Sequence, residues 1–116
     1  MSEPSVLDVP GIGLGPASQV PVGEGRLFEV GSRTVAVFRL RDGGFRATDP
    51  WCPHRGGPLA DGLVGAGTVT CPFHGYRFDL SSGCAVGHDC PPIATYPVSL
   101  DAAGELRLHV EGVLRD

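Results

Sequence analysis

One stretch of the sequence reads Cys52-Pro53-His54-Arg55-Gly56-Gly57-Pro58-Leu59, and a second reads Cys71-Pro72-Phe73-His74-Gly75-Tyr76-Arg77-Phe78-Asp79. Each stretch offers one thiol and one imidazole, in the spacing C-x-H, then sixteen residues, then C-x-x-H. The Gly and Pro residues in both stretches favour shaped loops over helices or central strands. Two Cys and two His on two loops can bind a metal centre, so we expect Cys52, His54, Cys71 and His74 to hold one.

The segments around these stretches predict antiparallel β-strands. Apolar and polar residues alternate, β-branched and aromatic residues are frequent, and short Gly-containing turns separate the runs. The expected strands are residues 26–30, 33–40, 45–48, 95–100 and 105–110. Period-two alternation places one set of side chains inside, namely Leu27, Val35, Val37, Leu40 and Phe45. Pro97 predicts an edge position or a bulge for its strand, because proline donates no ladder hydrogen bond.

The strand pattern breaks between residues 49 and 92, where Gly and Pro are dense. Only residues 68–70 and 76–78 have strand-like composition there. An irregular segment of this length inside a compact domain needs a reason, and a bound cofactor supplies one. We therefore expect one domain over residues 1–116, an all-β antiparallel sandwich or partial barrel with a small inserted cofactor-binding subdomain at about 49–92.

The N-terminal fifteen residues predict a loose lead-in with one short strand near residues 6–9. Within it, Gly11-Ile12-Gly13-Leu14-Gly15 has the glycine content of a phosphate loop. The Lys-Ser/Thr pair of such loops is missing and Pro16 follows, so we interpret this run as a flexible bend.

Charge and composition exclude several classes of function. The formal net charge of −4 argues against a nucleic-acid partner, which favours a basic surface. The N-terminus has no basic region followed by an apolar run, and no segment is long and apolar enough to span a membrane. These features predict a cytoplasmic protein, in whose reducing environment Cys/His clusters more often bind metal than form disulfides.

The two loop stretches resemble the cluster loops of the Rieske family, whose [2Fe–2S] centres have two Cys and two His ligands. The resemblance implies the Rieske fold and one cluster per chain. It also implies that Cys52 and Cys71 bind one iron while His54 and His74 bind the other. The implied function is one-electron transfer within a larger oxidoreductase system, with no catalysis by this chain alone.

Other residues gain roles from the same resemblance. Gly56, Gly57 and Gly75 would let backbone N–H groups point at the cluster sulfides. Pro53 and Pro72 would stiffen the ligand loops. A third loop, Cys90-Pro91-Pro92, falls where the family has a proline-containing cover over the cluster.

The sequence differs from the respiratory branch of this family. Gly57 and Phe73 stand where that branch has two further Cys residues that form a disulfide between the loops. Tyr76 and Phe78 stand where it has hydroxyl donors that raise the reduction potential. Fewer donors to the cluster sulfurs lower the potential, so the resemblance implies the ferredoxin-like, low-potential branch.

Within that branch the sequence is most similar to the small subunit of NAD(P)H-dependent nitrite reductase. The matching segments are residues 54–62, 71–80 and 90–98. The implied partner is a large flavin- and sirohaem-bearing subunit. The alternative is a stand-alone Rieske ferredoxin that carries electrons from a reductase to an oxygenase.

A structural zinc site in an interaction module is a further alternative, although zinc sites favour Cys pairs spaced by two to four residues. Cys84, His88 and Cys90 have no assigned role: the two thiols are ordinary, or they form a reversible disulfide or, with His88, a second metal site. Trp51 is expected to shield the cluster or pack under it. Arg55 and Arg77 flank the ligand loops and are either solvated or in contact with an acidic partner.

Overall fold

The computed structural model describes residues 11–53, 56–73, 75–87 and 89–109. Within these ranges the chain forms strands and two single-turn 3₁₀-helices, and none of its helices is long and apolar enough to span a membrane. The elements are β1 (Ile12–Pro16), η1 (Ala17–Gln19), β2 (Gly25–Val30), β3 (Arg33–Arg39), β4 (Phe45–Thr48), η2 (Leu59–Asp61), β5 (Leu63–Gly65), β6 (Thr68–Thr70), β7 (Arg77–Asp79), β8 (Ala85–Val86), β9 (Thr95–Tyr96), β10 (Val98–Leu100) and β11 (Glu105–Leu108).

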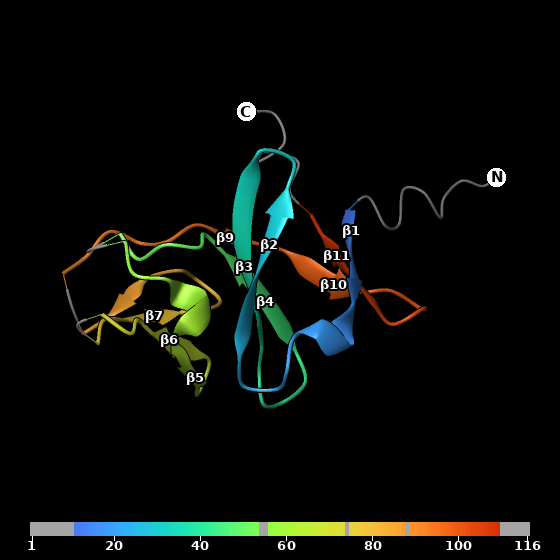
Figure 1. Ribbon diagram of the computed structural model, residues 1–116. Helices are drawn as coiled ribbons and strands as arrows, with labels where there is room; N and C mark the ends of the chain where they lie inside the picture. Colours follow the sequence, from blue (N-terminus) through green and yellow to red (C-terminus); the bar gives the residue numbers. More distant parts are fainter. Residues whose placement is uncertain (1–10, 54–55, 74, 88, 110–116) are drawn as a thin grey trace.

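The strands form three antiparallel sheets, which confirms the predicted all-β fold. Their strand orders are β2-β3-β4-β9, β1-β11-β10 and β5-β6-β7-β8. Figure 1 shows β2, β3 and β4 in the middle of the molecule, with β1, β10 and β11 on one side and β5, β6 and β7 on the other. The sheet β5–β8 and η2 fall between β4 and β9 in the chain, and we refer to this part as the lobe.

Strand β3 is buried on both faces because a separate core packs against each one. Val35 and Val37 belong to a core shared with β1, β10 and β11, whereas Ala36 and Phe38 belong to a core shared with the lobe. All four side chains are at most 1% exposed. The sheet β2-β3-β4-β9 is therefore the common wall of two cores, and one of them supports the lobe.

Four of the five side chains predicted to face inward are buried. Val35, Val37 and Phe45 lie in the core beneath β1 and β11, and Leu40 lies in the core beneath the lobe. The prediction for Leu27 is wrong, since this residue is 45% exposed. Leu27 pairs with Ala36 in the β2–β3 ladder, but β2 is the edge strand and Ala36 is the fully buried partner.

Two segments adopt structures other than those predicted. The run from Gly11 to Gly15 is not a flexible bend, because residues 12–16 form β1 and pair with β11 through a register shift between Gly13 and Gly15. The expected strand over residues 95–100 is split at Pro97 into β9, which pairs with β4, and β10, which pairs with β11. Both pieces are edge strands of their sheets, as Pro97 predicts. The expected strand at residues 6–9 lies outside the described residues.

The two ends of the lobe are joined by hydrogen bonds. The Asp49 amide donates to the carbonyl of Ala94 at 2.9 Å, and the Ala94 amide donates to Asp49 Oδ2 at 3.4 Å. The Tyr96 hydroxyl donates to Asp49 Oδ1 at 2.6 Å. Because residue 49 precedes the lobe and residues 94–96 follow it, these bonds fix where the lobe leaves the central sheet.

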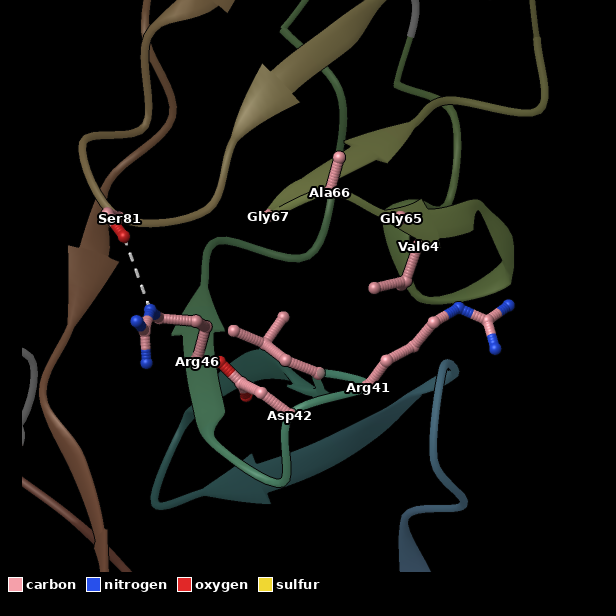
Figure 2. A pocket seen from close by; sticks show the side chains of 9 residues that line it. Arg41, Asp42, Arg46, Val64, Gly65, Ala66, Gly67 and Ser81 are labelled. Atoms are coloured by element: carbon pink, nitrogen blue, oxygen red, sulfur yellow. Dashed lines mark hydrogen bonds between the residues drawn. The ribbon is translucent and has the colours of Figure 1, made fainter.

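A second hydrogen bond connects the lobe to the central sheet. Figure 2 shows a pocket between the turn after β3 and the turn after β5, where Arg46 reaches across from β4 to Ser81. The Arg46 Nε donates to Ser81 Oγ at 3.3 Å. The pocket has a volume of about 370 Å³, and its described lining includes neither Cys52 nor Cys71.

The hydrogen bond between Tyr96 and Asp49 generates a prediction on stability. Burial, followed by the hydrogen bond and charge of Asp49, raises the pKa of Tyr96 to about 12, with a smaller opposing effect of Arg33. A hydrogen bond to a charged group contributes about 1.5 kcal/mol, so Tyr96→Phe should lower the free energy of unfolding by about that amount at pH 8.

The pH dependence follows from the raised pKa. Unfolded tyrosine loses its proton near pH 10, while folded Tyr96 keeps its proton to about pH 12. The stabilisation is therefore complete below pH 10 and is lost as the pH rises towards 12. Urea unfolding of both proteins between pH 8 and pH 11.5 should show the difference shrinking. A difference independent of pH would contradict this account.

Candidate metal centre

The first predicted ligand loop, residues 52–57, is closed by two backbone hydrogen bonds. The Cys52 amide donates to the carbonyl of Gly57 at 2.8 Å, and the Gly56 amide donates to the carbonyl of Cys52 at 2.6 Å. A bridge between Trp51 and Pro58 extends this pairing below the loop. The loop thus stands on a short two-stranded stem between β4 and η2.

The second ligand loop, residues 71–76, repeats the same pattern between β6 and β7. The Cys71 amide donates to the carbonyl of Tyr76 at 2.7 Å, and the Gly75 amide donates to the carbonyl of Cys71 at 3.2 Å. In both loops the fourth residue after Cys is a glycine with left-handed backbone, φ +73° at Gly56 and +74° at Gly75. This conformation favours glycine and lets the chain return to its own cysteine.

The structure brings the two cysteines of these loops together in the lobe core. Cys52 is 1% exposed and Cys71 is 3% exposed, and both belong to one buried cluster. Burial raises the pKa of the Cys71 thiol, the hydrogen bond from the Phe73 amide lowers it, and the hydrogen bond and charge of Cys52 raise it. The two sulfur atoms therefore face each other across the loops.

The surroundings of Cys71 fit an iron-bound sulfur. The amide of Phe73 donates to Cys71 Sγ at 3.4 Å, a contact that stabilises negative charge on the sulfur. A Cβ atom at Gly57 would lie 2.6 Å from the same Sγ, so the backbone of the first loop approaches the sulfur as closely as it can. Two buried thiols with a backbone donor form the cysteine half of the expected ligand set.

The other two predicted ligands, His54 and His74, lie outside the described residues. Among the residues that the structure does describe, no group of three His, Cys, Asp or Glu side chains could hold a metal ion. The sequence places one of these His residues in each loop, between the Cys and the closing glycine.

The third loop lies against the core that contains the two cysteines. Cys90 is partly buried and packs against that core, while Pro91 and Pro92 are exposed. Burial raises the pKa of the Cys90 thiol, and the charges of Cys52 and Asp89 raise it further. Cys84 is exposed and, like Cys90, forms no disulfide. His88 lies outside the described residues.

Two aromatic residues beside the loops are more exposed than the sequence suggested. Trp51 is 49% exposed, so it does not pack under the site, and its other predicted role, shielding the cluster, stays a prediction. Phe73 is 48% exposed and was not singled out for its side chain. The hydrogen bond between Tyr96 and Asp49, which joins the two ends of the lobe, was not predicted either, because no local pattern links residues 47 positions apart.

Comparison with known proteins identifies the family. A model described as the Rieske [2Fe-2S] domain matches residues 12–97. The ferredoxin component of the naphthalene 1,2-dioxygenase/salicylate 5-hydroxylase systems of Ralstonia sp. is 31% identical over 86 residues, which are 71% of this chain and 79% of the relative. The structure of Sphingomonas yanoikuyae B1 ferredoxin matches with a TM-score of 0.75 and 32% identity, covering 84% of this chain and 96% of that one.

Other similarities are more distant or cover only part of a longer protein. A structure described as an NADH-dependent nitrite reductase small subunit from Mycobacterium tuberculosis matches with a TM-score of 0.77 at 22% identity, covering 84% of this chain and 91% of that one. This identity supports a shared fold only. The oxygenase component of a 3-ketosteroid-9-alpha-monooxygenase from Rhodococcus rhodochrous is 37% identical over 79 residues, 63% of this chain. The chain spans 20% of that relative's length, and 11% to 15% of three other matched oxygenases and desaturases.

The family match, the antiparallel fold and the paired cysteine loops agree with one another. The chain belongs to the Rieske [2Fe-2S] domain family, whose cofactor is one [2Fe–2S] cluster per chain.

Proposed function

We propose that this chain transfers single electrons to a protein partner through a [2Fe–2S] cluster held by Cys52, Cys71, His54 and His74. The lobe at residues 49–92 would be the cluster-binding subdomain. The observation that carries the proposal is the pair of matched loops that place two buried thiols together, with a backbone amide on one sulfur. When bound, the cluster supplies a site for one electron at a time.

The chain's own residues would determine the conditions around that site. Burial of Cys52 and Cys71 excludes water, and the Phe73 amide offsets negative charge on the Cys71 sulfur. Phe78 is fully buried and offers no hydroxyl donor. We therefore expect a reduction potential towards the low end of the range of roughly −150 to +300 mV found for such centres. Cys84 and Cys90, which would not bind the cluster, form no disulfide, and this fits a reducing compartment such as the cytoplasm.

The partner proposed is the oxygenase component of an aromatic-ring or similar oxygenase system. Ferredoxins of such systems are the relatives at 31% and 32% identity that this chain covers over most of their length. The surface around the loops offers a docking site rich in proline, glycine and aromatic residues. Its exposed members are Trp51, Pro53, Gly56, Pro72, Phe73, Gly75, Pro91 and Pro92. The described charged residues beside the loops are the exposed Arg77 and Asp89, and the sequence adds Arg55 in the first loop.

A second candidate is the small subunit of a nitrite reductase, with a large flavin- and sirohaem-bearing partner. The fold similarity to the M. tuberculosis protein, at a TM-score of 0.77, is the observation that favours this second candidate. The two candidates differ in their electron acceptor. The oxygenase component of carbazole 1,9a-dioxygenase and the large subunit of a bacterial nitrite reductase should therefore be mixed separately with the reduced chain. Faster oxidation by the nitrite reductase subunit would favour the second candidate.

The ligand assignment is tested by electron paramagnetic resonance of the dithionite-reduced protein, with iron and sulfide measured on the same sample. We expect about two irons per chain and a rhombic signal with the low average g value of mixed Cys/His ligation. Cys71→Ser and His74→Ala should lose the signal. Cys84→Ser should keep it, because Cys84 is exposed and lies outside the buried group. Zinc in place of iron, or a full spectrum in Cys71→Ser, would overturn the assignment.

The docking surface is tested by single-turnover oxidation of the reduced chain by the carbazole 1,9a-dioxygenase oxygenase component. Trp51→Ala should weaken docking about tenfold with the cluster retained, because exposed tryptophans dominate binding energy where they are buried by a partner. Leu100→Ala is the matched control, since Leu100 is 51% exposed on β10, in the sheet on the far side of the molecule. Equal effects of the two substitutions would argue against this surface.

A further inference from the structure

Gly57 marks the point where the two ligand loops touch. It is buried, and a Cβ atom there would lie 2.6 Å from Cys71 Sγ and 3.1 Å from Cγ of the Phe73 ring. Only a hydrogen atom fits between these groups. The neighbouring Gly56, and Gly75 of the second loop, are different because a Cβ at either position would meet nothing within 4 Å. Gly57 is thus required by close packing, whereas Gly56 and Gly75 are required by backbone conformation.

The contact between Gly57 and Phe73 is connected to both cysteines through the backbone. The Gly57 carbonyl accepts the hydrogen bond of the Cys52 amide at 2.8 Å. The Phe73 amide donates to Cys71 Sγ at 3.4 Å. A continuous path of short contacts therefore runs from Cys52 through Gly57 and Phe73 to Cys71, and it crosses from one loop to the other at the ring of Phe73.

The Phe73 side chain has no place in the core of the lobe. The ring is 48% exposed and is not a member of the buried cluster that contains Cys52 and Cys71. The ring lies against Gly57, where a Cβ atom would be 3.1 Å from its Cγ. A large ring held half in solvent against a glycine contributes little to core burial, which indicates a role in the loop contact itself.

We propose that Gly57 and the Phe73 ring form an inter-loop clamp that sets the position of Cys71 relative to Cys52. Gly57 and Phe73 act as positioning residues, since neither donates a side-chain ligand. The inference rests on the proposed function, because the two cysteines matter as cluster ligands. It adds that a non-covalent contact between the two loops helps to set their separation.

The first experiment uses the [2Fe–2S] holoprotein and its Phe73→Ala, Phe73→Tyr and Leu100→Ala variants. Loss of residues that orient metal ligands typically costs about tenfold in metal binding, so Phe73→Ala should release its cluster to a chelator about tenfold faster than the unchanged protein. Its reduction potential and g values should also shift. Phe73→Tyr keeps the ring and should behave as the unchanged protein. Leu100→Ala removes a side chain of similar exposure on β10, in the sheet away from the loops, and should not alter cluster release.

The second experiment compares Gly57→Ala with Gly65→Ala. Gly57→Ala places a methyl group against Cys71 Sγ and should reduce the iron content to near zero while circular dichroism retains the β-sheet signal. Gly65→Ala is the matched control, because a Cβ at Gly65 meets nothing within 4 Å and its φ is not left-handed. If Gly57→Ala does not fold, the Phe73 variants test the inter-loop clamp without it.

Unchanged cluster release, potential and g values in Phe73→Ala would overturn the clamp while leaving electron transfer intact. A normal iron content in Gly57→Ala would also overturn it. Failure of the unchanged protein to bind a [2Fe–2S] cluster would instead overturn the proposed function. The two failures are therefore distinguishable from the same set of samples.

Discussion

The site depends on the two backbone hydrogen bonds that close each cysteine loop. In both loops the amide of Cys bonds to the carbonyl five residues later, and its carbonyl accepts the amide four residues later. These bonds satisfy the backbone groups of a segment that has neither helix nor ladder partners. They also bring Cys52 and Cys71 to equivalent positions in two similar frames. The same hydrogen-bonded loop thus occurs twice in the chain, and each copy supplies one cysteine to the site.

The central sheet gives these loops a rigid support. Strand β3 contributes Phe38 and Ala36 to the lobe core and Val35 and Val37 to the opposite core, so movement of the lobe against the sheet would disturb close packing on both faces. Two hydrogen bonds, from Tyr96 to Asp49 and from Arg46 to Ser81, add polar contacts around the same junction. The cysteine loops are thus held by contacts that lie well outside the site.

The sequence predicted the two cysteine loops better than the long-range packing. The loops were identifiable because Cys-Pro pairs, nearby His residues and glycines recur locally, and the hairpin of β2 and β3 has a local turn and alternation. Leu27 was assigned to the interior because alternation cannot tell an edge strand from a central one. Gly11 to Gly15 became β1 because β11, almost a hundred residues later, supplies the partner. The placement of His54 and His74 stays a prediction.

The partner of an electron carrier must associate quickly and dissociate again after the transfer. The surface around the loops is suited to such transient binding. Proline, glycine and ring side chains lose little conformational entropy when they are covered, so docking costs less ordering than it would on a surface of long charged side chains. The same residues keep the ligand loops stiff, since Pro53 and Pro72 follow the two cysteines. Stiff loops would hold the proposed ligands in nearly the same place before and after the electron moves. The proline and glycine residues that make the cysteine loops irregular therefore contribute both to the geometry of the site and to the surface around it.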